Sequence, residues 1–447
     1  MAERRCQAII LAAGQGTRMK SSKPKVLHEV AGLSMAGHVT KVARDAGVEL
    51  VSVVVGPEME AVHKAAAAIH PAVYAHVQTE RLGTGHAVLA AKADLVEACD
   101  DVIVLFGDTP LLRTETILAM RQKLAEGNDV VVLGFRTDEP GPYGRLLEEA
   151  GKLVAIREAK DCSPEELGVT FCNGGIMGFS GKVILSLLES IGSNNAQGEY
   201  YLTDAVELAN ARGLAVTAIE APEAELQGVN NRAHLAKVEA SYQAAARLKA
   251  MEEGATLLAP DTVFFSHDTK LGRDVLIEQN VIFAPGVSVA DHATIRAFSH
   301  LEGASVAEGC VVGPYARLRP GTELEADVKI GNFVETKKAK IEKGAKVNHL
   351  SYIGDARIGS KANIGAGTIT CNYDGFNKFQ TDIGVGAFIG SNTALVAPAK
   401  IGDGAIVGAG SVITSPVNAD ALAVTRAKAF VKDGWAAAFR AKKAKKS

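Results

Sequence analysis

The chain has 447 residues, more than a single domain usually needs, and 47% of them are hydrophobic, which is enough for full cores. Glycine occurs 45 times, whereas aromatic residues make up only 5%. The formal net charge of −3 gives no general basic field to attract a phosphate backbone, so we expect no nucleic-acid partner. The one basic run is the C-terminal tail, Arg440 to Lys446, for which a solvated disordered end is favoured over a binding patch.

Three features predict the compartment. No apolar run reaches the roughly 18 residues that a membrane span needs. The first residues lead directly into an apolar strand, which is not the pattern of a signal peptide. The six cysteines are scattered without a CxxC pair, which indicates free thiols in a reducing environment. We therefore expect a cytoplasmic protein that does not insert into a membrane.

Apolar runs alternate with helical patterns through the N-terminal half of the chain. Strand-like runs occupy residues 6–11, 51–55, 102–106 and 130–134, and helical patterns between them occupy 36–46, 59–69 and 85–92. This alternation predicts an α/β domain with a parallel sheet covered by helices on both faces. Such sheets bind their ligands at the carboxyl ends of the strands.

A glycine-rich segment, Leu11–Met19 (LAAGQGTRM), follows the first strand. Glycines there let backbone N–H groups approach a phosphate chain, and the start of a following helix favours negative charge. The spacing alone is a weak signal, because a structural turn would fit it equally well. The segment 23–28 (KPKVLH) strengthens the prediction, since a lysine beside a phosphate-binding loop neutralises charge on a leaving pyrophosphate.

A candidate metal ligand follows the third apolar run, in the segment 106–111 (FGDTPL). Asp108 at the carboxyl end of a parallel strand is well placed to hold Mg²⁺ between nucleotide phosphates. An aspartate that caps a helix or a turn is the alternative. A single carboxylate rarely holds Mg²⁺ without help, and Asn230 is the candidate for the second oxygen ligand.

The C-terminal half repeats every six residues. Aliphatic residues return with this period from about Ile277 to Ile413, and glycine or another small residue usually follows them. A period of six fits neither a helix nor a flat strand. It predicts a parallel β-solenoid, in which each hexad is one short strand and a turn, and three hexads complete one triangular coil. A helical stretch at 233–253, free of proline and glycine, would connect this solenoid to the first domain.

One segment of the solenoid breaks the hexads. Residues 370–382 must therefore project as a loop, and projecting loops on regular scaffolds are where binding residues concentrate.

Polar clusters also recur about one coil apart, so Arg319, Lys337 and residues 349–352 should converge on one face. Arginine and lysine there would suit a phosphate. His349 could take a proton from an attacking amine, although the residues alone favour a hydrogen-bonded structural histidine.

The motifs of the first half resemble those of the sugar-nucleotide pyrophosphorylases. With the solenoid, nearly the whole chain resembles the bacterial bifunctional N-acetylglucosamine-1-phosphate uridylyltransferase/glucosamine-1-phosphate acetyltransferases. Further matching motifs are QTERLGTGH at 78–86, PYGR at 142–145, IREAKD at 156–161, FCNGG at 171–175 and GVNNR at 228–232. Small departures occur at residues 32–35 and after Asn173, where two glycines follow, and neither touches a residue assigned to chemistry.

The resemblance implies three parts. Residues 1–232 would form a Rossmann-like nucleotidyltransferase domain, 233–253 a linker helix, and 254–447 a left-handed parallel β-helix acetyltransferase domain with the basic tail. It also implies a homotrimer that assembles through the β-helix.

For the first domain the resemblance implies transfer of a uridylyl group from UTP to N-acetylglucosamine 1-phosphate, with pyrophosphate leaving and Mg²⁺ as the metal. Arg18 and Lys25 would stabilise the phosphates, and Asp108 with Asn230 would hold the metal. The implied UTP contacts are Leu11, Ala13, Gly14, Lys25, Gln78, Gly83 and Thr84, and the implied N-acetylglucosamine contacts are Gly144, Glu158, Asn173 and Asn230.

For the solenoid the resemblance implies direct acetyl transfer from acetyl-CoA to the amine of glucosamine 1-phosphate. It makes His349 the general base. The implied glucosamine 1-phosphate contacts are Arg319, Lys337, Tyr352, Asn363 and Lys378, and the implied acetyl-CoA contacts are Ala366, Asn372, Tyr373, Ser391, Ala409 and Arg426.

The sequence therefore predicts a bifunctional enzyme that makes UDP-N-acetylglucosamine, a precursor of peptidoglycan and lipopolysaccharide in the cell envelope. One alternative is a nucleotidyltransferase whose β-helix is only a trimerisation scaffold. The polar clusters and the projecting loop speak against it, because a bare scaffold needs neither. The other alternative is a non-catalytic sugar-nucleotide sensor, against which Asp108 and Lys25 speak together.

Overall fold

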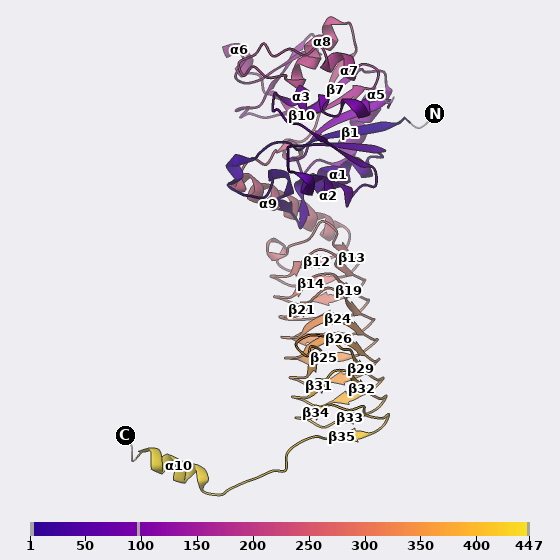
Figure 1. The fold of residues 1–447 in the computed structure, drawn as a ribbon, viewed down its shortest axis with the longest axis vertical. Coiled ribbons are helices and arrows are strands. Elements are labelled where there is room, and N and C mark those ends of the chain that lie inside the picture. The colour runs from indigo at the N-terminus through magenta and orange to yellow at the C-terminus, as the bar shows by residue number, and fades with distance from the viewer. Residues whose placement is uncertain (1–3, 96–98, 445–447) are drawn as a thin grey trace. The chain divides into compact units, whose positions relative to one another are not determined.

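The computed structural model describes residues 4–95 and 99–444. The chain forms two compact units, residues 1–245 and 246–447, and helix α9 (Arg232–Glu252) spans the boundary between them (Figure 1). Each unit has its own hydrophobic core. None of the described helices combines the length and the apolar character of a membrane span.

The first unit is built on a nine-stranded sheet of order β11-β7-β10-β6-β1-β4-β5, to which the hairpin β8–β9 is added through β10. Its strands are β1 Cys6–Leu11, β4 Leu50–Val55, β5 Val73–Val77, β6 Asp101–Phe106, β7 Val130–Arg136, β8 Arg145–Glu149, β9 Lys152–Arg157, β10 Phe171–Ser180 and β11 Val216–Glu220, with a small hairpin of β2 Glu29–Val30 and β3 Leu33–Ser34. The four strand-like runs of the sequence are β1, β4, β6 and β7.

Helices cover both faces of this sheet, as predicted. They are α1 Met35–Asp45, α2 Glu60–Ala67, α3 Thr84–Leu89, α4 Lys92–Leu95, α5 Thr114–Ala125, α6 Pro164–Leu167, α7 Ile184–Leu188 and α8 Ala205–Ala211. Alternate residues of each central strand enter opposite cores. Ile10 packs in the core with α1, α2 and α5, whereas Ile9 packs in the core with α3, α7 and α8.

Along the main path of seven strands, one strand differs from the expected parallel arrangement. β10 lies between β6 and β7 and runs antiparallel to both. The chain reaches it from β7 through the hairpin β8–β9 instead of a crossover helix, and only a helical crossover obliges the next strand to run parallel. An apolar run has no direction of its own, so the sequence pattern could not reveal this reversal.

The second unit is a three-sided parallel β-solenoid. Its first side holds β12 Thr256–Leu257, β14 Leu276–Ile277, β17 Thr294–Ile295, β20 Val311–Val312, β23 Lys329–Asn332, β25 Lys346–His349, β27 Asn363–Ile364, β30 Phe388–Ile389, β33 Ile406–Val407 and β35 Leu422–Ala423. The repeat therefore continues past Ile413, because β35 still pairs in parallel with β33.

The other two sides share one sheet. The second side holds β15 Ile282–Phe283, β18 His300–Leu301, β21 Arg317–Leu318, β28 Ile369–Cys371, β31 Ala394–Val396 and β34 Val412–Ile413. The third side holds β13 Lys270–Leu271, β16 Ser288–Val289, β19 Ala304–Val306, β22 Thr322–Leu324, β29 Thr381–Ile383 and β32 Ala399–Ile401. Two longer strands, β24 Glu335–Ile341 and β26 Tyr352–Ile358, bend across the corner and belong to both sides.

Aliphatic side chains stack coil upon coil inside the solenoid. Ile341, Ile358 and Ile383 are register partners on the third side, and each is fully buried. Hydrogen bonds between coils usually span about 18 residues, whereas the pair across the inserted segment spans 25. The extra residues leave the coil as the projecting loop, as the break in the hexads predicts.

The described part of the C-terminal tail differs from the disordered end that was expected, and Lys445 and Lys446 lie outside the described residues. Residues 435–444 form helix α10 (Trp435–Ala444), and all of its described side chains are exposed. Trp435 and Phe439 stack on one another, with ring centroids 5.2 Å apart. A one-turn spacing places these rings on the same face of a helix, and three alanines between them favour helix formation.

The stacked core makes a stability prediction. Replacing Ile358 by alanine removes a fully buried side chain between two stacked isoleucines, and we expect the free energy of unfolding of the solenoid to fall by about 2–4 kcal/mol. Urea unfolding followed by circular dichroism would measure it. Lys340→Gln, an exposed change on the same side, is the control and should stay within about 0.5 kcal/mol of wild type. Equal values for the two variants would contradict the stacking argument.

Candidate active sites

The glycine-rich segment of the first unit packs directly on Lys25. Gly16 has a φ of +62°, and a Cβ added there would lie 2.5 Å from the Cβ of Lys25. Only glycine accepts that backbone conformation at such a close approach without strain. The segment and the lysine therefore form one structural feature, although eight residues of sequence separate them.

Four of the predicted phosphate and metal residues meet beside this segment. The ammonium of Lys25 forms an ion pair with the carboxylate of Asp108. Arg18 donates from its guanidinium to Oδ1 of Asn230 over 3.0 Å. The backbone N–H of Val229 donates to the carbonyl of Asp108 over 3.0 Å, which brings the segment carrying Asn230 to the end of β6. Two cations thus face two oxygen-bearing side chains at the carboxyl edge of the sheet.

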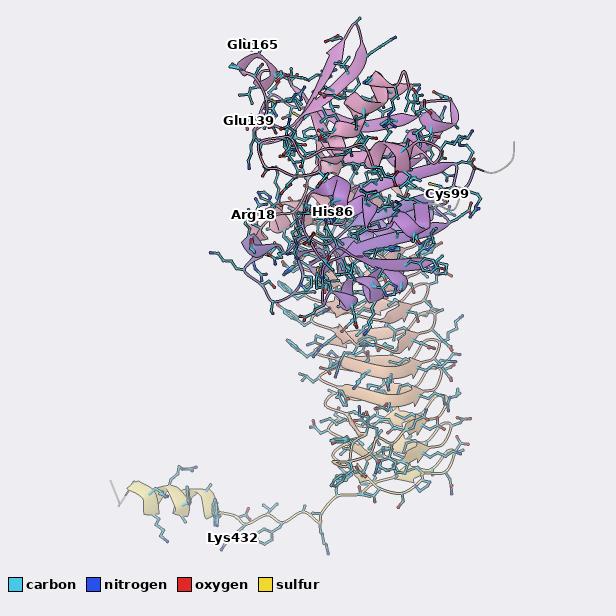
Figure 2. The ribbon with its side chains drawn as sticks, turned by 45° about the horizontal axis from the view of Figure 1, so that its top comes forward. Arg18, His86, Cys99, Glu139, Glu165 and Lys432 are labelled. Atoms are coloured by element: carbon cyan, nitrogen blue, oxygen red, sulfur yellow. The ribbon has the colours of Figure 1, made fainter. Side chains whose placement is uncertain are left out.

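The loop after β5 lies against the same edge. The backbone N–H of Gln78 donates to Val55 at the end of β4 over 2.8 Å, and its side-chain amide donates to the carbonyl of Gly83 over 3.3 Å. Arg81 donates to the carbonyl of Ala13 over 3.1 Å, which joins this loop to the glycine-rich segment. Figure 2 shows Arg18 towards one side of the unit, Cys99, which precedes β6, towards the other, and His86 between them.

The predicted N-acetylglucosamine contacts form a second group in this unit. Asn173 donates from its backbone to the carbonyl of Gly144 over 2.8 Å. A Cβ added to Gly144 would lie 3.4 Å from both the Cβ of Asn173 and Oε1 of Glu158, so the three residues converge. Burial, followed by the nearby charge of Asp161, raises the pKa of the Glu158 carboxyl. A half-buried acceptor of this kind suits a sugar hydroxyl, which can donate to it.

Candidate metal ligands are few. Within the described residues there is no group of three or more histidine, cysteine, aspartate or glutamate side chains that could hold a metal ion. Asp108 and Asn230 offer two hard oxygen donors, which is the chemistry that Mg²⁺ prefers, and the remaining ligands would have to come from substrate phosphates and water. The residues present therefore fit Mg²⁺ only as a partner of a bound nucleotide.

Three cations gather at the corner between the second and third sides of the solenoid. Lys337 follows Thr336, whose carbonyl accepts a hydrogen bond from the backbone of Arg319 over 2.9 Å. The Lys378 ammonium on the projecting loop, followed by the Arg319 guanidinium, lowers the pKa of Lys337 because like charges disfavour its protonated form. The only carboxylate in an ion pair with Arg319, among the described residues, is Glu335, at 2.8 Å. The corner has an excess of positive charge and suits a phosphate.

Tyr352 lies beside this corner. Its register neighbour across the coils is Glu335, and a Cβ added to Gly354 would lie 2.4 Å from the tyrosine hydroxyl oxygen. Gly354 in turn pairs with Lys337. The missing side chain at Gly354 is therefore what lets the tyrosine hydroxyl lie against the backbone next to the cations.

His349 lies at the next corner, between the first and second sides. The expectation that residues 349–352 converge with Arg319 and Lys337 is therefore only partly correct, because the second side separates the two corners and Tyr352 lies between them. The Nδ1 atom of His349 is 2.7 Å from Oδ1 of Asn332, its register partner one coil earlier. An amide oxygen only accepts, so Nδ1 carries the proton and the exposed Nε2 keeps its lone pair.

The predicted acetyl-CoA contacts continue from His349 along the same corner. Successive coils are joined there by backbone hydrogen bonds from Gly367 to His349, from Asn392 to Ala366 and from Gly410 to Ser391, at 3.3, 2.7 and 2.8 Å. Two further close approaches extend this corner to Ala409 and Arg426. A Cβ on Gly390 would lie 2.4 Å from the nitrogen of Ala409, and one on Gly410 would lie 3.7 Å from Cδ of Arg426. The corner is thus a narrow strip of small residues that runs from His349 to Arg426.

The projecting loop leaves the corner that holds the cations. Asn372 is buried and donates from its side chain to Asp355 over 2.5 Å, whereas Tyr373 is exposed. A single β-bridge between Tyr373 and Lys378 closes the loop. Asn363 is the one predicted sugar-phosphate contact that lies elsewhere, on the first side opposite Lys346.

Two residues that support the site carry no role in the sequence analysis. Asn332 fixes the tautomer of His349, and Glu335 pairs with Arg319. Asn332 precedes His349 by 17 residues and Glu335 follows Arg319 by 16, so each lies about one repeat from its partner and the coil period could have identified both. The ion pair Lys25–Asp108 has no comparable signal, because it joins residues 83 positions apart through the sheet.

Comparisons with known proteins identify the family. A protein named "Bifunctional protein GlmU" from Azorhizobium caulinodans is 59% identical over 445 residues, which cover 100% of this chain and 99% of that protein. One of the same name from Agrobacterium fabrum is 56% identical over 438 residues, covering 98% and 97%. The chain belongs to the bifunctional GlmU family. It is therefore an enzyme with two transferase activities, uridylyl transfer and acetyl transfer, which together make UDP-N-acetylglucosamine.

Two further comparisons concern the first unit. The MobA-like NTP transferase domain matches residues 8–165, which carry the glycine-rich segment, Lys25 and Asp108. A crystal structure of a UDP-glucose pyrophosphorylase complexed with UDP-glucose is 17% identical, with a TM-score of 0.42, and covers 54% of this chain and 99% of that one.

The contact between Gly16 and Lys25 generates a prediction. Gly16→Ala adds a Cβ at a positive φ against the Lys25 backbone, so the lysine must move away from Asp108. We expect kcat/KM for uridylyl transfer to fall at least tenfold while acetyl transfer is unchanged, measured by pyrophosphate release and thiol release. The control is Gly192→Ala, where a Cβ meets nothing within 4 Å. A Gly16→Ala enzyme with normal uridylyl transfer would contradict this role of the glycine.

Proposed function

We propose that this chain carries out the two reactions at the two sites described above, uridylyl transfer in residues 1–232 and acetyl transfer in residues 254–447, with 233–253 as the connecting helix. The observation that carries the proposal for the solenoid is the fixed tautomer of His349, with a strip of small residues on one side and a corner of cations on the other. A scaffold that only holds subunits together needs no such arrangement.

In the first unit the residues provide position and charge. Gln78, Gly83 and Thr84, with Leu11, Ala13 and Gly14, form the wall where uridine would bind, and an amide with backbone donors and acceptors matches uracil. Arg18 and Lys25 would stabilise the phosphates, and the sugar would bind at Gly144, Glu158 and Asn173. Attack of the sugar phosphate on the α-phosphorus forms one P–O bond and breaks another, and pyrophosphate leaves. No protein nucleophile is required.

We assign Asp108 and Asn230 to Mg²⁺, which supplies charge neutralisation between the phosphates when it is bound. Lys25 and Arg18 bind the oxygens of these two residues in the free protein. A bound triphosphate would attract both cations, which exposes Asp108 and Asn230 to the metal. The same four residues would then pair with one another in the free protein and bind the triphosphate and the metal in the complex.

In the solenoid, glucosamine 1-phosphate would bind with its phosphate at Arg319, Lys337 and Lys378 and its sugar against Tyr352. Acetyl-CoA would lie along the strip Ala366–Ser391–Ala409, with Arg426 at its end and Asn372 and Tyr373 on the loop beside it. Nε2 of His349 would take a proton from the amine as the new C–N bond forms and the C–S bond of the thioester breaks. CoA leaves as the thiol.

We further propose a homotrimer through the β-helix. Exposed strand residues of the third side are charged or are serines, whereas apolar residues are exposed on the last coils of the other two sides: Phe388, Ile406 and Leu422 on the first, and Ile369 and Val412 on the second. In a closed ring, each copy would pack one of its apolar sides against the other apolar side of its neighbour. A neighbour would also bring Asn363 towards a cation corner, from which it is separated within one chain. We place this enzyme in the cytoplasm, without a nucleic-acid partner.

The experiment that tests the proposal is thiol release from acetyl-CoA with glucosamine 1-phosphate, without UTP. Release that depends on the amino sugar is expected and excludes the scaffold and the sensor alternatives. No release, from protein that still forms pyrophosphate from UTP and N-acetylglucosamine 1-phosphate, would overturn the proposal for the solenoid.

Crossed substitutions should separate the two sites. His349→Ala removes the base, so we expect acetyl transfer to fall about 10²–10⁴-fold with uridylyl transfer within twofold of wild type. Asp108→Ala should do the reverse and remove Mg²⁺-dependent UTP turnover. Both activities measured on each purified variant form the test, and loss of both in either variant would indicate misfolding and contradict the assignment.

The lowered pKa of Lys337 predicts a pH dependence. The protonated lysine binds phosphate, and that form is lost as the pH rises through its lowered pKa. The KM for glucosamine 1-phosphate should therefore rise at a lower pH than an ordinary lysine would give. Lys378→Met removes the first cause of the shift and should move this rise to higher pH, as measured from pH profiles of KM. An unmoved profile would contradict the coupling of the two lysines.

A further inference from the structure

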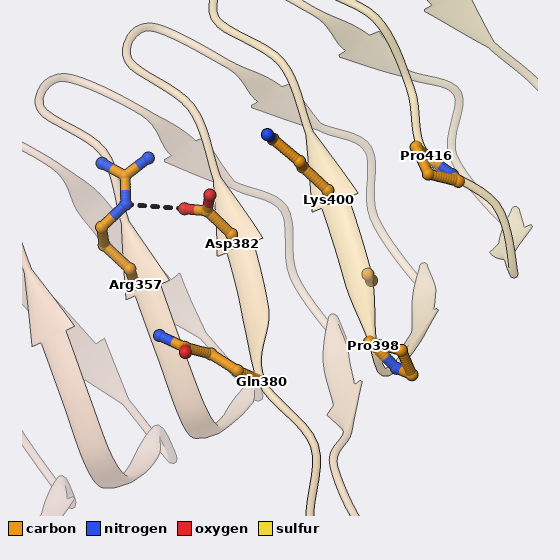
Figure 3. A pocket seen from close by; sticks show the side chains of 7 residues that line it. Arg357, Gln380, Asp382, Pro398, Lys400 and Pro416 are labelled. Carbon is orange, nitrogen blue, oxygen red and sulfur yellow. Dashed lines mark hydrogen bonds and ion pairs between the residues drawn. The ribbon is translucent and has the colours of Figure 1, made fainter.

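A shallow cavity of about 450 Å³ lies on the third side of the solenoid. It is lined by Arg357, Gln380, Asp382, Pro398, Ala399, Lys400 and Pro416 (Figure 3). Gln380 and Asp382 are the last residues of the segment that breaks the hexads. The cavity therefore lies where the projecting loop returns to the solenoid.

At the return of the loop, Arg357 adds a side-chain link to the parallel pairing of β29 with β26. Nε of Arg357 donates to Oδ1 of Asp382 over 2.6 Å, the interaction drawn in Figure 3. Nη1 of Arg357 donates to Oε1 of Glu342 over 2.9 Å. The other carboxylate oxygen of Glu342 accepts from the backbone of Ser360 over 3.0 Å. Arg357 is thus bonded both to Glu342, one coil earlier, and to Asp382, at the end of the loop.

The departure of the loop is held differently. The hydroxyl of Thr370 accepts from the backbone N–H of Gly354 over 2.8 Å and donates to the carbonyl of Gly354 over 3.0 Å, and all of this is buried. Asn372 then bonds Asp355. The first end of the loop is therefore tied to the coil by a buried hydroxyl and a buried amide, and the second end by the pairing of β29 with β26 and by a partly exposed ion pair at Asp382.

Between these ends the tip of the loop is held by its own turn, in which the Asp374 carboxylate accepts from the backbone N–H groups of Phe376 and Asn377. Phe376 is 92% exposed, and the bridge between Tyr373 and Lys378 is an isolated one. Lys378 lies four residues before Asp382, so the position of its ammonium beside Lys337 depends on how the returning strand is fixed. A shift of that strand by a small distance would move the one cation of the corner that the coil itself does not carry.

We propose that Arg357 and Asp382 are positioning residues for acetyl transfer, which hold the projecting loop so that Lys378 meets the phosphate of the sugar substrate. The inference rests on the function proposed for the solenoid. Neither residue touches the substrate. A partly exposed ion pair is worth little to global stability, so its effect should appear in binding of the sugar phosphate and not in folding.

The test uses the full-length enzyme and both of its activities. Arg357→Gln and Asp382→Asn should each raise the KM for glucosamine 1-phosphate about three- to fivefold, with kcat for acetyl transfer within twofold and uridylyl transfer unchanged. The double variant should be no worse than either single one, because the two residues act through one contact. Hydrogen exchange should become faster in residues 370–382 and remain unchanged elsewhere in the solenoid.

Lys340→Gln is the matched control. Lys340 is the register partner of Arg357 one coil earlier, on the same side, and pairs with Glu325 at 3.5 Å, but no loop returns at that coil. It should leave every constant unchanged. The proposal is overturned if Arg357→Gln and Asp382→Asn keep the wild-type KM, if their effects add in the double variant, or if both activities fall together with the melting temperature. A wild-type enzyme without acetyl transfer would instead refute the function proposed for the solenoid.

Discussion

In-register stacking of parallel coils is the constraint on which the second half of the molecule depends. Each coil must place its inward aliphatic residue on that of its neighbour, as Ile341, Ile358 and Ile383 do, because a shift by one residue would turn the whole hydrophobic set outward. With that register fixed, every outward residue is fixed too. Asn332 faces His349, and Arg319 lies beside Lys337, only because the core beneath them allows no other alignment.

The same constraint explains where chemistry can be placed on the solenoid. Flat sides repeat and leave no room for variation, so the candidate site uses the corners. One corner carries glycines and alanines, which let a long ligand lie close to the backbone, and another carries the cations. The single insertion occurs at the cation corner, and it adds a lysine that the repeating coil could not supply without breaking its pattern.

The first unit brings its candidate site residues together by a different geometry. Its parallel strands bring their carboxyl ends to one edge, and segments far apart in the sequence meet there. Lys25 and Asp108 illustrate this. Lys25 lies after β1 and Asp108 lies after β6, and they form an ion pair because β1 and β6 are neighbours in the sheet. The two units thus place cations against phosphate sites by unrelated geometries, which fits two independent reactions on one chain.

The sequence by itself determined the repeat, the projecting loop and the helices on both faces of the sheet, because each of these depends on local spacing. Most of the candidate site residues came from the family resemblance of its motifs. It did not determine the direction of β10, since an apolar run reads alike in both directions. It also did not separate His349 from the cation corner, because sequence distance does not distinguish neighbouring corners of one coil. The ion pairs Arg357–Asp382 and Lys25–Asp108 were decided by tertiary structure alone, since each joins segments that only the folded sheets bring together.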